Sequence, residues 1–260
     1  MIAGSEIRIK HFTELPSTND TAKLMAEEGA PEGLVVRADR QTAGRGRFER
    51  KWESPAGKGL WFSLVLRPRI ELKRIGLINV FTALFLRNII DRLLRETPGK
   101  KQINVYLKWP NDILIGTKKV CGILLESSSR FNKVEYLIVG VGLNVLQTRG
   151  DFGEEIRNMA TSLKMESGRD FQLSLLLDDI VNGYFSDYRQ AVEENFSGII
   201  PEYERHLLYL YQEIQVQTLK GRISGKMIGV DENGFLRLET ASGEMKITAG
   251  DIWTDTRLPV

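Results

Sequence analysis

The sequence changes its hydrophobic pattern near Ile214, and this change divides the chain into two regions with different expected folds. In the first region, short β-rich runs are separated by glycine-bearing or polar turns, which is typical of strands in one sheet. The runs cover residues 34–37, 60–66, 105–109, 120–125 and 136–145. Helical patterns over 75–95 and 173–194 predict helices against this sheet, and a shorter capped helix is expected over 21–28. The expected fold class is α+β, with helices flanking a mixed β-sheet.

After Ile214 the helical patterns stop and short strand-like runs follow one another. These runs cover 214–219, 222–230, 235–239 and 245–247, and residues 231–234 predict a tight turn. Short strands without helices predict a small β-barrel. We therefore expect a large domain over residues 1–212, with an irregular linker around 148–170, and a small domain over residues 213–260.

The charge balance argues against a chain that binds a polyanion or a membrane over its whole surface. The 260 residues include 36 Lys and Arg and 34 Asp and Glu, for a formal net charge of +2. Any anion site must therefore be local. The single cysteine, Cys121, cannot form an internal disulfide, and the first residues lack the apolar core of a signal peptide. We expect a cytoplasmic protein without a membrane span.

The segment 41–52 (QTAGRGRFERKW) concentrates glycines and cations between two predicted strands. It carries two glycines and the cations Arg45, Arg47, Arg50 and Lys51. Exposed backbone amides beside guanidinium groups suit a phosphate chain. A flexible basic surface loop explains the composition equally well. The segment is not a Walker loop, because the only comparable run, at 221–227, has the wrong spacing and no hydroxyl after its lysine.

A second cluster, KWPND at 108–112, lies where one predicted strand ends and the next begins. For Pro110 and Asp112 the favoured interpretation is a structural turn, and for Trp109 and Trp61 it is a place in the core. The lysines are different. Lys108 and the later Lys119 flank a connection between strands, where a lysine near glycine backbone could lie between two anionic reactants.

Two further clusters have a structural and a functional interpretation. The segment 140–144 (GVGLN) places two glycines in a strong strand, which indicates either a β-bulge or a close approach to the backbone, and we favour the bulge. Helix N-capping accounts for Ser17, Thr18 and Asn19. His11 and His206, the only histidines, show neither metal-ligand spacing nor an adjacent nucleophile, and Cys121 is expected to be a buried structural thiol.

Taken in order, these clusters resemble the biotin protein ligase family. The resemblance rests on residues 17–19, 41–52, 108–112 with Lys119 and Gly122, and 140–144. It covers the first region nearly end to end, and the glycine-arginine segment and KWPND carry most of its specificity. It implies a mixed-sheet catalytic domain of the class II synthetase and biotin–lipoate ligase type, followed by a small SH3-like barrel that matches the pattern after Ile214.

The resemblance also implies a reaction and its residues. The expected reaction is the ATP-dependent activation of biotin to biotinyl-5'-AMP, with transfer of biotin to a lysine of a biotin carboxyl carrier domain. Lys119, which would bridge the biotin carboxylate and the α-phosphate, and Arg47, on the closing loop, are the expected catalytic residues. The implied biotin contacts are Ser17, Thr18, Asn19, Gln41, Arg45, Gly46, Arg47, Lys119, Gly122, Gly140 and Gly142. The implied ATP contacts are Arg47, Arg50, Trp52, Asn111, Lys119 and Asn144. Mg²⁺ is expected with ATP, with its ligands unassigned.

Other functions remain open at this stage. A lipoate or octanoate ligase shares the catalytic fold, and a biotin-binding sensor or interaction module would need no turnover. KWPND and the barrel favour biotin, and the presence of both Arg47 and Lys119 favours an enzyme. Some family members carry an N-terminal helix-turn-helix, whereas here the first motif begins at Ser17, so we expect a monofunctional ligase that does not bind DNA. A homodimer paired through an edge of the main sheet is expected.

Overall fold

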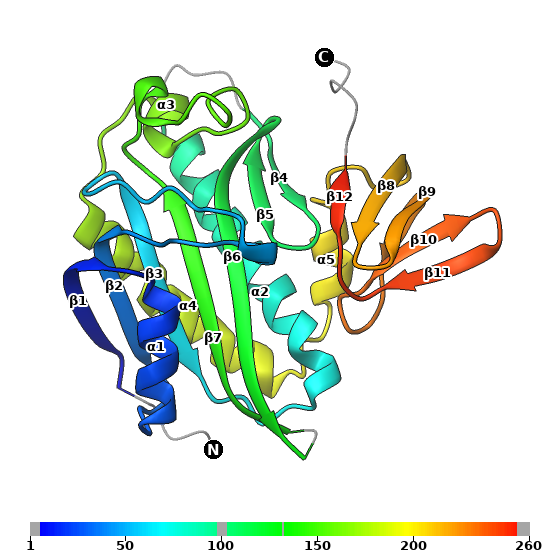
Figure 1. Cartoon of the computed structure of the whole chain (residues 1–260), viewed down its shortest axis with the longest axis horizontal. Helices are drawn as coiled ribbons and strands as arrows, with labels where there is room; N and C mark the ends of the chain where they lie inside the picture. The colour runs from blue at the N-terminus through cyan, green and yellow to red at the C-terminus, as the bar shows by residue number, and fades with distance from the viewer. Residues whose placement is uncertain (1–5, 98–102, 132, 254–260) are drawn as a thin grey trace.

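The computed structural model describes residues 6–97, 103–131 and 133–253 and contains two β-sheets with helices on both sides of the larger one (Figure 1). The large sheet has the strand order β1-β2-β3-β7-β6-β5-β4. β1 and β2 are parallel and the other neighbours are antiparallel, so the sheet is mixed. Its strands are β1 (Arg8–Leu15), β2 (Leu34–Gln41), β3 (Gly59–Leu66), β4 (Val105–Lys108), β5 (Asp112–Ile115), β6 (Lys118–Arg130) and β7 (Lys133–Asn144).

Apolar residues that alternate along the central strands build a core on each face of the large sheet. Val35 and Leu64 point into the larger core, while their neighbours Val36 and Val65 point into the smaller one. Because both faces are covered, all eight residues of β3 are buried. The double coverage explains why 60–66 is an almost continuous apolar run rather than an alternating one.

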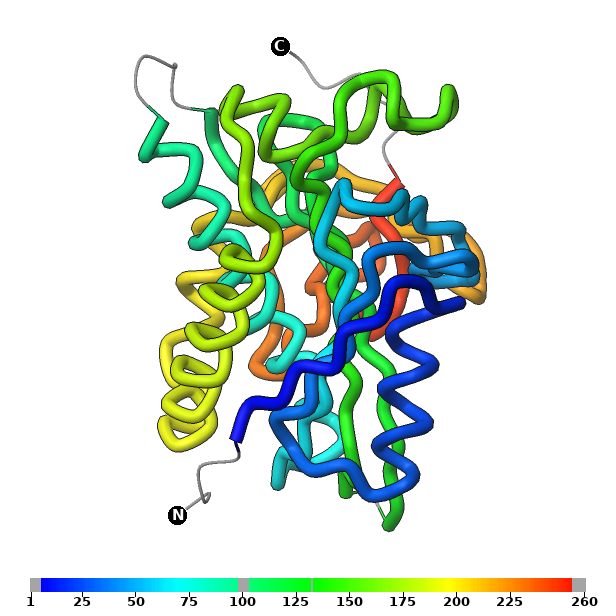
Figure 2. The backbone as a smooth tube through the Cα atoms, turned by 90° about the vertical axis from the view of Figure 1, so that its left-hand side faces the viewer, coloured from blue at the N-terminus to red at the C-terminus, as the bar shows by residue number. Residues whose placement is uncertain are grey.

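Helices supply the two covers. α1 (Thr18–Glu27) packs on the smaller core through Ala22 and Ala26, while α2 (Ile75–Arg95) and α4 (Leu173–Glu193) contribute to the larger core. Figure 2 shows α1 and α4 on opposite sides of the sheet. Two short helices, α3 (Leu163–Ser167) and α5 (Ile199–Glu204), lie in the connections around α4.

The C-terminal region forms a five-stranded antiparallel sheet in the order β11-β10-β9-β8-β12. Its strands are β8 (Glu213–Thr218), β9 (Gly221–Val230), β10 (Leu236–Thr240), β11 (Gly243–Ile247) and β12 (Asp251–Trp253). The predicted turn at 231–234 is present, with Asp231 Oδ1 accepting from the backbone N–H groups of Asn233 and Phe235 at 2.9 Å each.

The small sheet packs against the large region without a gap in the core. Val216 and Met227 belong to the same hydrophobic cluster as β3 and α2. Polar contacts support the junction: Trp109 Nε1 donates to Gly234 O at 3.1 Å, and Val230 N donates to Glu204 Oε1 at 2.8 Å. The KWPND segment is therefore fixed partly by a contact with the small sheet through Trp109.

The expected elements are present with shifted ends. The helix at 75–95 has the predicted bounds, the helix expected over 21–28 begins at Thr18, and the linker at 148–170 contains α3. Strands β1, β5 and β12 have no counterpart among the sequence predictions. β1 lies at the sheet edge with no fully buried residue, so it lacks the apolar run on which the other strand predictions rested. Among the described residues no helix is long and apolar enough to cross a membrane.

Candidate functional site

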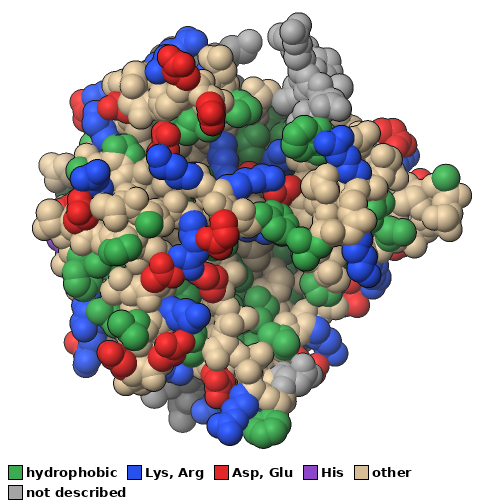
Figure 3. All heavy atoms as spheres, viewed as in Figure 1, with side chains coloured by type: hydrophobic (Ala, Val, Ile, Leu, Met, Phe, Trp, Pro, Cys, Tyr) green, Lys and Arg blue, Asp and Glu red, His purple; other side chains and the backbone are tan. Residues whose placement is uncertain are grey.

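A cavity of about 1050 Å³ lies between the large sheet, the glycine-arginine segment and the small sheet. Figure 3 shows a hollow on this face with Lys and Arg side chains gathered around it. Every residue predicted for the site lines the cavity, in spite of their wide separation in sequence. They are Ser17, Thr18, Asn19, Gln41, Arg45, Gly46, Arg47, Arg50, Trp52, Asn111, Lys119, Gly122, Gly140, Gly142 and Asn144.

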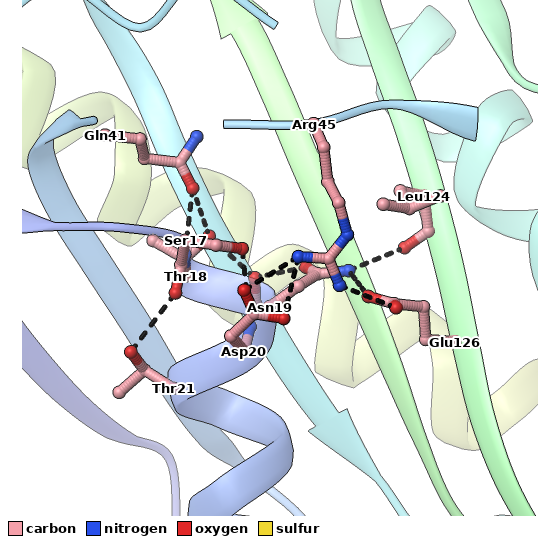
Figure 4. A network of polar contacts seen from close by, with 10 residues as sticks. Ser17, Thr18, Asn19, Asp20, Thr21, Gln41, Arg45, Leu124 and Glu126 are labelled. Carbon is pink, nitrogen blue, oxygen red and sulfur yellow. Dashed lines mark hydrogen bonds and ion pairs between the residues drawn. The ribbon is translucent and has the colours of Figure 1, made fainter. Parts of the chain in front are cut away.

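The start of α1 places a buried polar cluster at one end of the cavity (Figure 4). Ser17 caps the helix, as its sequence position predicts, and accepts from Asp20 N. Thr18 donates through its backbone N–H to Gln41 Oε1 at 2.8 Å, and Asn19 accepts from Ser63 Oγ at 2.6 Å. N-capping therefore explains Ser17 alone, whereas Thr18 and Asn19 are buried in a network that reaches β2 and β3.

Arg45 lies over this cluster between two carboxylates (Figure 4). Its guanidinium donates to Asp20 Oδ2 at 2.7 Å and to Glu126 Oε1 at 2.8 Å, and Glu126 Oε2 accepts from Asn19 Nδ2 at 2.6 Å. Burial acts to lower the pKa of Arg45, but the hydrogen bonds to Asp20 and Glu126 outweigh it and the pKa is raised. Glu126 thus joins β6 both to α1 and to the loop.

The glycines of β6 and β7 keep the cavity wall flat. A Cβ at Gly140 would lie 2.1 Å from Asn19 Oδ1, and one at Gly142 would lie 2.5 Å from Trp52 Nε1. The bulge that we favoured for 140–144 is wrong, because β7 pairs in continuous register with β3 and β6 through these residues. A close approach of side chains to the backbone is the reason for the glycines.

The glycine-arginine segment folds back on itself across the cavity. Trp52 N donates to Gly44 O at 2.8 Å and Gly46 N donates to Arg50 O at 2.7 Å. Within the turn, Phe48 and Glu49 have positive φ values of 54° and 56°, a conformation that costs energy for residues other than glycine. The segment forms a hairpin-like loop with a short 3₁₀ turn at Arg47–Glu49.

Trp52 lies against the glycine wall with its polar atom unused. Its ring packs over Gly142 and Gly122, and Nε1 is buried without a hydrogen-bond partner among the described residues. A buried indole N–H that lacks a partner carries a desolvation cost. The ring of Trp52 thus forms part of the cavity lining.

Cations and one carboxylate occupy the middle of the cavity. Lys119 Nζ lies 2.6 Å from Asp112 Oδ1 and 5.0 Å from the centre of the Trp52 ring. The Lys119 backbone is fixed from the other side, since its N–H donates to Met159 O at 2.8 Å. Burial lowers the pKa of Lys108, an effect that Asp112 opposes and Lys119 reinforces. Trp109 and Trp61 are buried core residues, as expected.

Two asparagines of the cavity, Asn111 and Asn144, hold its backbone through side-chain hydrogen bonds. Asn111 Nδ2 donates to Ile123 O at 2.7 Å, and Asn144 Nδ2 donates to Thr161 O at 3.0 Å.

Cys121 is fully buried, and burial raises the pKa of its thiol well above the ordinary range. It is therefore an inert core thiol, as the sequence predicted.

Some polar contacts of the predicted site residues come from residues that were absent from the sequence predictions. Asp251 contacts Arg47 and Arg50, Glu126 contacts Arg45, and Ser63 joins Thr18 to Asn19. A usable signal existed only for Ser63, because a lone hydroxyl inside a fully apolar strand indicates a specific partner. Glu126 and Asp251 are distant in sequence from the motifs that they contact.

No group of three His, Cys, Asp or Glu side chains suited to a metal ion occurs in the part of the chain that the structure describes. A magnesium ion on nucleotide phosphates would keep several waters and need only one or two protein carboxylates. Asp112 is a carboxylate within the cavity.

Comparison with known proteins gives a consistent family assignment. Residues 11–144 match the biotin/lipoate A/B protein ligase family, and residues 210–253 match the biotin protein ligase C-terminal domain. The chain is 38% identical to the bifunctional ligase/repressor BirA of Bacillus subtilis, over 96% of this chain and 78% of that protein. It is 30% identical to the biotin–[acetyl-CoA-carboxylase] ligase of Paracoccus denitrificans, over 91% of this chain and 96% of that protein.

The fold agrees with solved structures of such proteins. The biotin protein ligase of Aquifex aeolicus in complex with biotin and ATP superposes with a TM-score of 0.75 at 33% identity, over 95% of this chain and 97% of that one. Its apo structure superposes with a TM-score of 0.76 at 27% identity. With the two family matches and relatives of this similarity over nearly the whole length, the chain belongs to the biotin/lipoate A/B protein ligase family.

Proposed function

We propose that this chain is a biotin protein ligase that works in two steps. In the first, the biotin carboxylate attacks the α-phosphorus of ATP, which forms biotinyl-5'-AMP and releases pyrophosphate. In the second, an uncharged lysine amine of a carrier domain attacks the acyl carbon, which forms an amide and releases AMP and the amine proton. The observation that carries the proposal is one cavity in which a buried polar cluster and the cations Lys119 and Arg47 lie together, in a chain of this family.

The polar end of the cavity suits the ureido ring of biotin. Thr18, Asn19 and Gln41 present amide and hydroxyl groups there, and the glycine wall with Trp52 gives a flat apolar surface for the rest of the ligand. The dithiolane ring of lipoate has no comparable donors or acceptors, so it would gain no hydrogen bonds from these groups. The other proposed biotin contacts are Ser17, Arg45, Gly46, Arg47, Lys119, Gly122, Gly140 and Gly142.

The middle of the cavity suits the reacting anions. A carboxylate and a phosphate 4 Å apart repel each other by about 4 kcal/mol at an effective dielectric constant near 20. Lys119 offers a point charge between the two, and Arg47 offers a planar fork that matches phosphate oxygens. Both are held in place by their protein contacts, so stabilising the transition state requires little reorganisation.

The nucleotide is proposed to occupy the side of the cavity lined by Arg50, Trp52, Asn111 and Asn144. Because both asparagines already donate to backbone carbonyls, and Asn144 Oδ1 also accepts from Gln147 Nε2, their ATP role would be to fix the shape of the pocket. Magnesium bound to ATP would neutralise charge on the departing pyrophosphate.

The partner follows from the second step. A biotin ligase must present its adenylate to a protein lysine, so the proposed partner is the biotin carboxyl carrier domain of a carboxylase, as the name of the Paracoccus relative indicates.

We further propose that the chain forms a homodimer through the exposed edge strand β1. We also propose that it does not bind DNA, which the net charge of +2 supports. We also propose that residues 1–212 and 213–260 form the catalytic and the small domain.

Transfer to a purified carrier domain tests this function. Incubation with biotin and ATP should add the mass of one biotinyl group to a single carrier lysine, and omission of ATP should abolish the addition. Lipoate in place of biotin should give no product. A carrier that gains lipoyl but no biotinyl group would contradict the proposal.

A further inference from the structure

Asp251, at the start of β12, contacts two arginines of the glycine-arginine loop (residues 44–52). Arg47 Nη1 donates to Asp251 Oδ1 at 2.9 Å and to the neighbouring Gly250 O at 2.8 Å. Arg50 Nη1 lies 2.8 Å from Asp251 Oδ2 as an ion pair. One carboxylate of the small sheet therefore joins two cations of the cavity rim, and only 19% of its side-chain surface is exposed.

The backbone that carries Asp251 is firmly supported. Ile252 is buried in the main core and pairs with Val216 of β8. A Cβ at Gly250 would lie 2.7 Å from Val216 Cγ1, so this part of the chain lies directly against β8. The carbonyl of Gly250 and the carboxylate of Asp251 are thus fixed acceptors for an arginine that approaches from the large region.

The 3₁₀ turn at the tip of the loop, Arg47–Glu49, has no core contacts to hold it. None of its residues is buried, and two of them have left-handed backbone conformations. Apart from Gly46 N to Arg50 O, the turn is closed by a single longer bond of 3.3 Å, from Arg50 N to Arg47 O. A short strained turn without core contacts persists only where surrounding groups fix it.

We propose that Asp251 is a positioning residue that holds the glycine-arginine loop over the cavity and makes the small sheet part of the active site. Asp20 and Glu126 hold Arg45 at one end of the loop, and Asp251 holds Arg47 and Arg50 at the other. Fixing these guanidinium groups in advance removes part of the ordering cost of binding an anion. The identity of the ligand beneath the loop rests on the proposed function, whereas the contacts that hold the loop do not depend on it.

Limited digestion with trypsin tests the proposal without biotin or ATP, because the loop carries the cleavage sites Arg45, Arg47, Arg50 and Lys51. Cleavage requires the loop to leave its folded position, so its rate reports local opening. We expect Asp251→Asn and Asp251→Ala to speed cleavage after Arg47 and Arg50 about ten-fold, which corresponds to about 1.4 kcal/mol. Asp251→Glu, which keeps the carboxylate, should restore part of the protection.

Glu213→Gln, at an exposed acid of the same sheet, is the matched control and should cleave like the parent. Parental cleavage rates in both Asp251 variants would overturn the proposal. So would equally fast cleavage at Lys220, Arg222 and Lys226 in Asp251→Asn, because Asp251 would then serve only the fold of the small sheet. A parent enzyme that fails to biotinylate a carrier would defeat the proposed function but leave the cleavage result unaffected.

Discussion

Lys119 Nζ lies 2.6 Å from Asp112 Oδ1, so the lysine proposed to meet both reactants is already paired with a carboxylate from the adjacent strand β5. In the β5–β6 pairing, Asp112 lies opposite Gly122 and Leu114 lies opposite Lys119, and the register shifts between Ile113 and Leu114. The pair fixes the direction of a flexible lysine and offsets part of the repulsion among the cations of the cavity. Asp112, which the sequence suggested as part of a turn, thus also orients Lys119.

Asp112→Asn should slow adenylate formation about ten-fold, because a hydrogen bond to a charged group is worth about 1.5–3 kcal/mol. The asparagine keeps the shape of the side chain but leaves Lys119 without its anionic partner. Stopped-flow or quench measurement of biotinyl-5'-AMP under single-turnover conditions gives the rate. An unchanged rate would show that Lys119 needs no partner for its orientation.

Arg47→Ala should increase the release of free adenylate and slow turnover. Arg47 joins the loop to Gly250 and Asp251, and a loop that opens admits the water that hydrolyses a mixed anhydride. The loss is expected to be about ten-fold or more, since mutations that weaken closure affect both binding and turnover. Separation of free from enzyme-bound adenylate measures it, with exposed Arg40→Ala as the control. Equal leakage in both variants would argue against a closing role.

Glu126→Gln should raise the KM for biotin about ten-fold with a smaller effect on kcat, because loss of charge-assisted hydrogen bonds to Arg45 and Asn19 weakens ground-state binding. Glu135→Gln, on the neighbouring strand β7 with an exposed hydrogen bond to Ser128, is the control. Steady-state kinetics at saturating ATP separates the two constants. A fall in kcat alone would place Glu126 in the chemical step instead.

Lys108→Met should stabilise the fold at neutral pH and lose this advantage in alkali. Burial lowers the pKa of Lys108, so between the folded and the unfolded pKa the folded state binds fewer protons and stability rises with pH. Below that window both states are protonated and the full burial cost remains. We expect a gain of about 1 kcal/mol at pH 7, typical of single substitutions, that shrinks as pH approaches 10.4. Urea unfolding at several pH values measures it, and a gain that grows with pH would refute it.

The sequence predicted which residues line the cavity better than which residues hold them in place. All predicted site residues line one cavity, and they belong to short contiguous motifs, where local pattern carries information. Glu126 and Asp251 act through contacts with Arg45 and Arg47, which are 81 and 204 residues away in the chain. Such contacts can be predicted only when the order of the strands in the sheet is known. The bulge expected at 140–144 failed for a related reason, since the side chains that approach Gly140 and Gly142 come from α1 and the loop.

The central claim is that Lys119 and its cavity activate the carboxylate of biotin. ATP–pyrophosphate exchange tests it directly, with biotin or lipoate as the acid and with the parent, Lys119→Ala and the neighbouring Lys118→Ala. We predict exchange with biotin and not with lipoate, retained in Lys118→Ala and lost in Lys119→Ala. No exchange with biotin in the parent, or full exchange in Lys119→Ala, would contradict the account.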